Sequence, residues 1–110
     1  MTFVKVAQVS DVPAGKMKRV IANDKEILIV NVDGKLHAIG NVCTHMKGNL
    51  SEGVLEGSIV TCPKHGSKFD VTSGKSVQGP KVAFLKLKGK DEPTYETKIE
   101  GTDILVVLLH

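Results

Sequence analysis

Short apolar runs bounded by turn-forming residues restrict the fold of this chain more than any other feature. The runs are rich in β-branched residues and cover 16–21, 26–32, 35–39, 58–61, 84–88, 94–99 and 104–109. Turn pairs such as Asn23-Asp24 and Asp33-Gly34 separate them, and no long stretch has the apolar period of about 3.6 residues that is typical of an amphipathic helix. Many short strands joined by such turns predict an all-β fold, an antiparallel sandwich or barrel.

The length of 110 residues suits one domain, 1–110, and is too short for two substantial cores. No apolar run approaches the length of a membrane helix, so we expect no bilayer span. The first five residues, Met1-Thr2-Phe3-Val4-Lys5, lack the basic-then-apolar pattern of a secretory signal. We therefore expect a cytoplasmic protein.

The charge balance argues against nucleic acid as a partner. The formal net charge is only +3, and 14 of the 15 basic residues are lysines scattered along the chain. Phe3, Phe69, Phe84 and Tyr95 are the only aromatic residues. A nucleic-acid surface would combine clustered arginines with aromatic residues on which bases stack.

Two segments, 40–53 and 62–74, lack strand alternation, and each contains one cysteine and one histidine: Cys43-Thr44-His45 and Cys62-Pro63-Lys64-His65. Two converging loops would offer two thiolates and two imidazoles, a set that suits zinc or an iron–sulfur centre. The single residue between Cys43 and His45 is a tight spacing for one zinc ion, whereas residues i and i+2 of an extended loop can reach two adjacent metal atoms. The spacing favours a binuclear centre, and a zinc-stapled interaction module remains the alternative.

The segments 43–48 and 62–70 resemble the two cluster-binding loops of Rieske proteins, and Gly79-Pro80 stands where these proteins have a third loop that covers the cluster. The short length and strand pattern are similar to those of the small Rieske-type ferredoxins. The resemblance implies the Rieske fold, in which a small subdomain of two loops, about 41–50 and 62–74, binds the cluster beside a covering loop at about 78–82. It also implies a [2Fe-2S] cluster with Cys43 and Cys62 on one iron and His45 and His65 on the other. Two neutral imidazoles in place of thiolates raise the reduction potential.

Departures from the pattern place this chain in the lower half of the potential range. Gly48 and Lys64 stand where the high-potential branch of the family has two cysteines joined in a disulfide, and Phe69 replaces a tyrosine whose hydroxyl donates to a ligating cysteine. Loss of that donor lowers the potential, whereas Ser67 matches a hydroxyl donor of the high-potential branch and acts in the opposite direction.

Some neighbouring residues have supporting roles in this interpretation. Pro63 and Gly66 set the backbone of the second loop, and Met46 is expected to cover the cluster rather than bind it. His37 and His110 are expected to be structural or surface residues. The polar segment 90–93 is expected to be a surface loop.

By this resemblance the protein is a monomeric one-electron carrier between a flavin- or pyridine-nucleotide-dependent reductase and a terminal oxygenase or oxidase. The sequence contains no nucleotide-binding fingerprint, no nucleophile paired with a base and no ligand triad for mononuclear iron, so we do not expect an enzyme. The alternative is a small non-catalytic subunit of a larger reductase or oxygenase complex.

Overall fold

A computed structural model of the protein describes residues 2–44, 48–64, 66–79, 81–82, 85–86 and 90–108. Strands dominate the described part of the chain and confirm the all-β prediction. They are β1 (Thr2–Gln8), β2 (Met17–Ala22), β3 (Lys25–Val32), β4 (Lys35–Gly40), β5 (Val54–Glu56), β6 (Ile59–Thr61), β7 (Lys68–Asp70), β8 (Ser76–Gln78), β9 (Lys81–Val82), β10 (Leu85–Lys86), β11 (Thr94–Glu100) and β12 (Asp103–Leu108). Two short 3-10 helices, η1 (Val9–Asp11) and η2 (Leu50–Glu52), join them, and no described helix has the length and apolarity that crossing a membrane requires.

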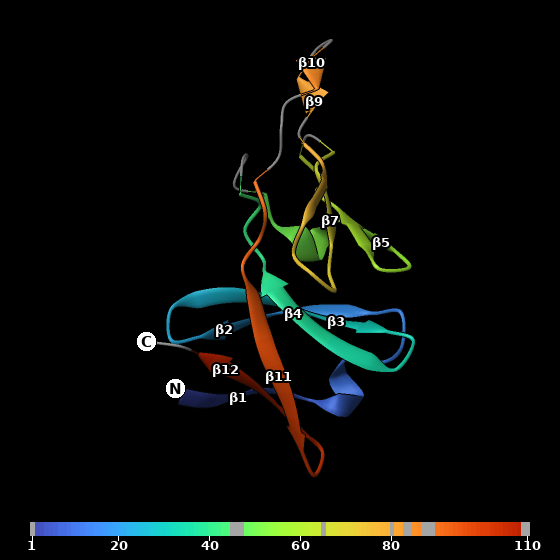
Figure 1. Cartoon of the computed structure of the whole chain (residues 1–110). Helices are drawn as coiled ribbons and strands as arrows, with labels where there is room; N and C mark the ends of the chain where they lie inside the picture. The colour runs from blue at the N-terminus through green and yellow to red at the C-terminus, as the bar shows by residue number, and fades with distance from the viewer. Residues whose placement is uncertain are drawn as a thin grey trace.

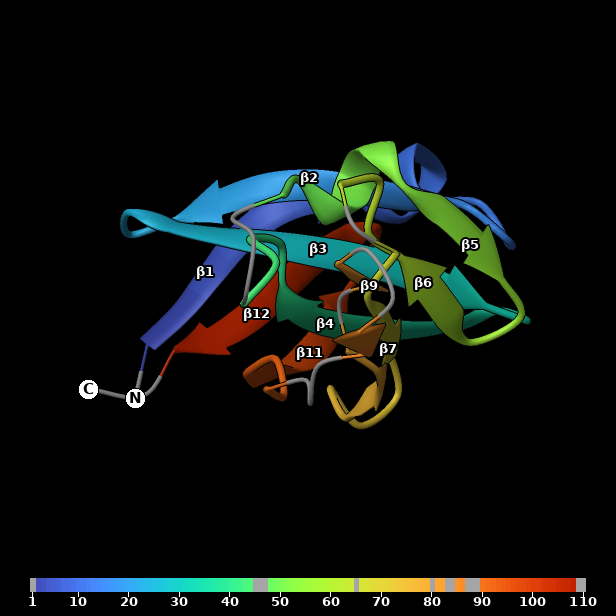
Figure 2. The same cartoon turned by 90° about the horizontal axis from the view of Figure 1, so that it is seen from above.

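The largest sheet has six antiparallel strands in the order β1-β12-β11-β4-β3-β2. Its two edge strands, β1 and β2, also contact each other, so the sheet curls into a nearly closed barrel (Figures 1 and 2). The turn between β3 and β4 has φ of 52° at Asp33 and 92° at Gly34. Positive φ at both positions is what a tight hairpin turn requires, and it confirms the turn predicted here.

A second antiparallel sheet, in the order β5-β6-β7-β8, lies at one end of the barrel (Figure 1). The first cysteine loop leads from β4 toward this sheet, and the second joins two of its strands, β6 and β7. The pair β9 and β10 lies beyond it. The molecule thus has a barrel at one end and the candidate site at the other.

Strand β3 connects two hydrophobic cores because its two faces are both buried. Ile27 and Ile29 point into the barrel core, whereas Leu28 and Val30 belong to the core that contains both cysteines. All four side chains are fully buried. The run of apolar residues in the sequence therefore reflects a strand covered on both sides.

The structure corrects the sequence interpretation at several strands. β1 was not expected, and it is stabilised by antiparallel pairing with β12 along its length. β7 lies inside the segment 62–74, which was expected to lack strands; pairing with β6 on one side and β8 on the other holds its three residues extended. Of the expected strand 84–88, the structure describes only Leu85–Lys86, which pairs with β9.

Candidate metal centre

Each cysteine of the predicted ligand set begins a short loop that its own backbone closes. The Cys43 N–H donates to the carbonyl oxygen of Gly48 (2.8 Å), and the Cys62 N–H donates to the carbonyl oxygen of Ser67 (2.7 Å). The Gly66 N–H tightens the second loop by donating to the Cys62 carbonyl (3.2 Å). Each loop therefore spans the position of one predicted histidine ligand.

Gly48 shows that the two loops converge. A Cβ atom built on Gly48 would lie 2.5 Å from the Cys62 sulfur and 3.7 Å from the Cys43 Cβ. Both cysteines therefore flank one glycine, and only a hydrogen atom fits between the first loop and the Cys62 sulfur. Both side chains are 1% exposed, and no disulfide joins them.

Gly48 and Lys64, where the sequence interpretation places the disulfide of the high-potential branch, also lie side by side. The Cβ built on Gly48 would be 3.6 Å from the Cβ of Lys64, within the usual range of about 3.5–4.5 Å for a disulfide. Gly48 and Lys64 are thus close enough for such a bond, but neither has a sulfur atom. The loops of this chain must be held together in another way.

Four predicted site residues, His45, Met46, His65 and Pro80, lie outside the described residues. The positions of the two imidazoles are therefore not part of the geometry, and the assignment of His45 and His65 as ligands stays a prediction. Within the described residues no three His, Cys, Asp or Glu side chains form a group that could hold a metal ion.

The described supporting residues lie next to the cysteines. Ser67 is 1% exposed, and its hydroxyl has no hydrogen-bond partner among the described residues. Phe69 is fully buried in the same apolar cluster as Cys43 and Cys62. The third loop contacts the second through the Gln78 side-chain amide, which donates to the Gly66 carbonyl (3.2 Å). Gly79 is buried beside it.

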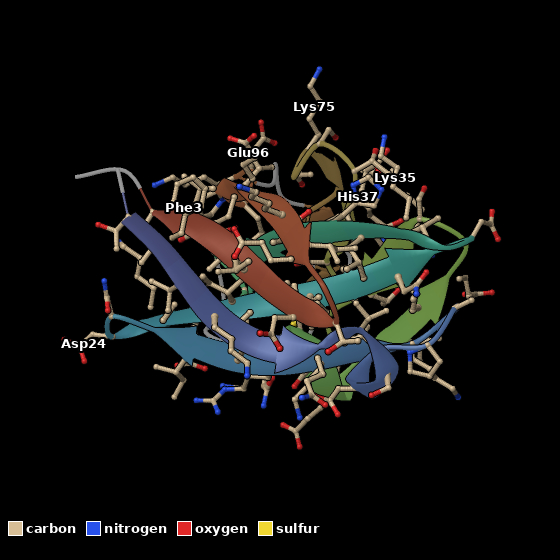
Figure 3. The ribbon with its side chains drawn as sticks, turned by 90° about the horizontal axis from the view of Figure 1, so that it is seen from below. Phe3, Asp24, Lys35, His37, Lys75 and Glu96 are labelled. Carbon is tan, nitrogen blue, oxygen red and sulfur yellow. The ribbon has the colours of Figure 1, made fainter. Side chains whose placement is uncertain are left out.

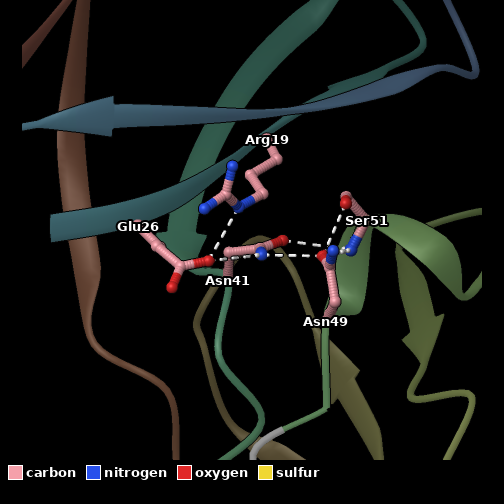
Figure 4. A network of polar contacts seen from close by, with 5 residues as sticks. All are labelled: Arg19, Glu26, Asn41, Asn49 and Ser51. Atoms are coloured by element: carbon pink, nitrogen blue, oxygen red, sulfur yellow. Dashed lines mark hydrogen bonds and ion pairs between the residues drawn. The ribbon is translucent and has the colours of Figure 1, made fainter.

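A polar network anchors the first loop to the barrel (Figure 4). The Asn41 side chain, fully buried, donates to the Asn49 side chain (2.8 Å), and its oxygen accepts from the Ser51 N–H (3.0 Å). On the barrel side, Glu26 accepts a hydrogen bond from Arg19 (2.7 Å), which holds the pKa of Glu26 below its usual value. The network fixes the loop on both sides of Cys43.

A buried carboxyl group lies against the first loop and was missed by the sequence interpretation. Glu92 is 5% exposed, and its Oε2 accepts a hydrogen bond from the Thr44 N–H (3.0 Å). Burial raises the pKa of Glu92 to about 7, although the Thr44 hydrogen bond acts in the opposite direction. Composition gave no signal of this burial, because Lys90, Asp91 and Pro93 around it are exposed, as a surface loop predicts.

His37 does not belong to the candidate centre. It lies on β4 beside Lys35, on the barrel (Figure 3). Partial burial, together with the positive charge of Lys35, lowers the pKa of His37. The fourth histidine, His110, lies outside the described residues.

Comparison with known proteins places this geometry in context. A family model described as the Rieske [2Fe-2S] domain matches residues 2–96. The biphenyl dioxygenase ferredoxin subunit of Pseudomonas sp. (strain KKS102) is 39% identical over 96% of this chain and 92% of its own length. A solved ferredoxin of Sphingomonas yanoikuyae B1 has a TM-score of 0.81 at 27% identity, covering 98% of this chain and all of that one. A chain from the complex of reduced oxygenase and oxidized ferredoxin in carbazole 1,9a-dioxygenase has a TM-score of 0.76 at 27% identity, over 94% of this chain and 91% of that one.

Proposed function

We propose a function from one premise: the chain belongs to the Rieske [2Fe-2S] domain family. On this premise the protein is a one-electron carrier that takes an electron from a reductase and passes it to a terminal oxygenase. The proposal is supported by the relatives, which are named as ferredoxin components or subunits of dioxygenase systems. It is also supported by the likeness to a chain from a complex of ferredoxin and oxygenase.

The observation that carries the proposal is the convergence of Cys43 and Cys62 on Gly48. We propose that these two cysteines hold one iron of the cluster and that His45 and His65 hold the other. Two thiolates at 1% exposure need positive charge beside them, because an unpaired buried charge is costly. The Ser67 hydroxyl, a buried donor with no described acceptor, suits the same group, since a cluster offers sulfur acceptors.

When bound, the cluster supplies a site that accepts and releases one electron. The residues of this chain determine how easily it does so. Apolar side chains, including Phe69 and Leu50, surround the cysteines and exclude water. These surroundings disfavour the negative charge that reduction adds, whereas the Ser67 hydroxyl stabilises that charge. The apolar surroundings and the missing tyrosine hydroxyl at position 69 together support a potential in the lower half of the range of about −150 to +300 mV for such clusters.

Cluster identity is tested by the colour, metal content and EPR spectrum of the purified protein. We expect red-brown protein with about two irons and two sulfides and, after dithionite reduction, an EPR signal with average g below that of an all-cysteine cluster. His45→Cys and His65→Ala should abolish or greatly alter the spectrum, whereas His37→Ala and His110→Ala should not. Colourless protein with one zinc ion would contradict the proposal and favour a zinc-stapled module.

Carrier function is tested by electron transfer. The cluster of the isolated protein should be reduced by a flavin- or pyridine-nucleotide-dependent reductase and reoxidised by an oxygenase component. A stable monomer with full cluster content favours the free carrier. Protein that keeps its cluster only within a larger assembly would favour the alternative, a small non-catalytic subunit.

We further propose a cytoplasmic location, where soluble partners of this kind are accessible.

Lysines near the candidate centre support docking to an acidic partner surface. Lys64 and Lys75 are exposed and Lys68 is half-exposed, and none of them belongs to an ion pair between described residues. Lys75 projects away from the molecule (Figure 3). Two further lysines of this group, Lys47 and Lys81, have side chains outside the described part. Such a surface accelerates encounter with an acidic partner by long-range attraction.

A further inference from the structure

The segment 90–93 contains a side chain that a surface loop does not explain. Glu92 is 5% exposed and is the one buried charged residue in the described part of the chain. A buried carboxyl group loses hydration and is tolerated only where the protein supplies partners. Its surroundings therefore indicate what it does.

This segment contacts the first cysteine loop at a residue that lies between two proposed cluster ligands. Thr44, the residue between Cys43 and His45, donates its N–H to Glu92 Oε2 (3.0 Å). The Thr44 hydroxyl donates to the carbonyl oxygen of Lys90 (2.7 Å). The middle residue of the ligand pair is thus held by both its backbone and its side chain.

The same segment also binds the second sheet and the barrel. The Glu92 N–H donates to the Gly74 carbonyl (2.8 Å), and the Ser76 N–H donates to the Asp91 side chain (2.8 Å). At the barrel, the Gly40 N–H donates to the Pro93 carbonyl (2.9 Å). Residues 90–93 therefore join the first cysteine loop, the chain that follows β7 and the end of β4.

Two glycines leave the space that Glu92 occupies. A Cβ on Gly40 would lie 2.5 Å from Glu92 Oε1, and a Cβ on Gly74 would collide with the Glu92 carbonyl oxygen. Gly74 also has φ of 75°, which side chains rarely adopt. Two distant parts of the chain, at Gly40 and Gly74, thus leave room for this one residue.

We propose that Glu92 is a positioning residue of the cluster centre, which holds the His45-bearing loop in place through the Thr44 N–H. This inference rests on the proposed function. The bond ties the first loop to segment 90–93, in a chain whose Gly48 and Lys64 cannot form the disulfide that staples the two loops in the high-potential branch. The bond gives the Thr44 N–H an acceptor inside the protein, and outer groups that fix a loop in this way orient the metal ligands that the loop supplies.

The test separates the reach of the side chain from its charge. Glu92→Gln keeps an oxygen that reaches the Thr44 N–H but removes the charge, whereas Glu92→Asp keeps the charge and is one methylene too short. Glu92→Ala removes both. Glu96→Gln is the matched control, because Glu96 is an exposed glutamate on the adjoining strand β11. The measurements are the EPR spectrum of reduced protein and the rate of cluster loss to a chelator, followed by visible absorbance.

Glu92→Ala and Glu92→Asp should lose the cluster about tenfold faster than the wild type, the factor expected when the Thr44 N–H is left without its acceptor. Their EPR g values should shift, because the orientation of His45 changes. Glu92→Gln and Glu96→Gln should keep the wild-type spectrum and a loss rate within about threefold of the wild type, since the Thr44 N–H keeps its acceptor in both.

Wild-type behaviour of Glu92→Ala and Glu92→Asp would overturn the inference while leaving the proposed function intact. A Glu92→Gln protein that loses its cluster as fast as Glu92→Ala would also overturn the inference, because the charge of residue 92 and not its hydrogen bond would then be decisive. Wild-type protein without a Rieske-type EPR signal would overturn the proposed function itself. If Glu92→Ala fails to fold, Glu92→Gln and Glu92→Asp still give the comparison.

Discussion

Gly48→Ala tests the convergence of the two cysteine loops most directly. The added Cβ would lie 2.5 Å from the Cys62 sulfur, whereas ordinary heavy-atom contacts are about 3.5–4.0 Å long. The sulfur and the first loop must therefore move apart by about 1 Å. Gly48 does not have the positive φ that would strain an alanine, so the contact alone determines the effect.

The magnitude depends on whether the cluster is bound. Alanine by itself would stabilise the fold by about 0.4–1 kcal/mol through the unfolded chain, and overpacking a buried site costs about 1–3 kcal/mol. In protein with the cluster, the Cys62 sulfur that we propose binds iron cannot turn away without breaking that bond, so we expect a net loss of about 1–2 kcal/mol. In cluster-free protein the Cys62 side chain can adopt another rotamer, and the loss should largely disappear.

The assay is urea unfolding of both forms, together with the visible and EPR spectra of the protein with its cluster. Gly57→Ala is the control, because Gly57 has φ of 62° and open space around its Cβ position. It should lower stability through backbone strain by about 1–2 kcal/mol in both forms and leave the spectra unchanged. A Gly48→Ala protein with wild-type spectra and stability would refute the convergence of the loops on Gly48.

Three further predictions concern potential, pH and salt. Ser67→Ala should lower the reduction potential and Phe69→Tyr should raise it, because each changes one hydrogen-bond donor near the cysteines; voltammetry measures both. Burial raises the pKa of Glu92 to about 7 from the ordinary 4.5, so protons bind more tightly to the folded chain. The free energy of unfolding in urea, measured for the wild type relative to Glu92→Gln, should be highest below pH 5, fall as the pH rises to about 7 and then level off. A difference that does not change with pH would contradict the burial of a titrating carboxyl group. Electron transfer to an acidic partner should slow with rising ionic strength, and rates that do not fall would contradict docking through the lysines.

The sequence predicted the fold class and the cysteine loops because both depend on local patterns. Apolar runs rich in β-branched residues, with turn pairs between them, determine strands such as β3 and β4, and the cysteines and histidines identify the loops. Strands β5, β7 and β8 have three residues each, too few to show alternation, and unlike the equally short β6 each contains at most one β-branched residue. Their extended form depends on pairing with neighbours, which a single sequence does not contain.

Glu92 shows the same limit in the candidate site. Its neighbours are polar and exposed, so composition predicts a solvated loop, and the carboxyl group is buried only because distant glycines, Gly40 and Gly74, leave room for it. Gly48 is similar, since its importance depends on a sulfur atom from the other loop. In each case the deciding contact joins residues that are far apart in the chain.

The two cores also link the proposed iron site to the barrel. Cys43 and Cys62 lie in one apolar cluster with Leu28 and Val30 of β3, the strand whose other face fills the barrel. An apolar cluster of this kind tolerates neutral thiols, but it cannot solvate two thiolates at 1% exposure. Positive charge from the proposed iron would remove that cost, and the stabilisation would reach the barrel through β3. Cluster loss should therefore weaken the barrel as well as the loops, because both share this strand.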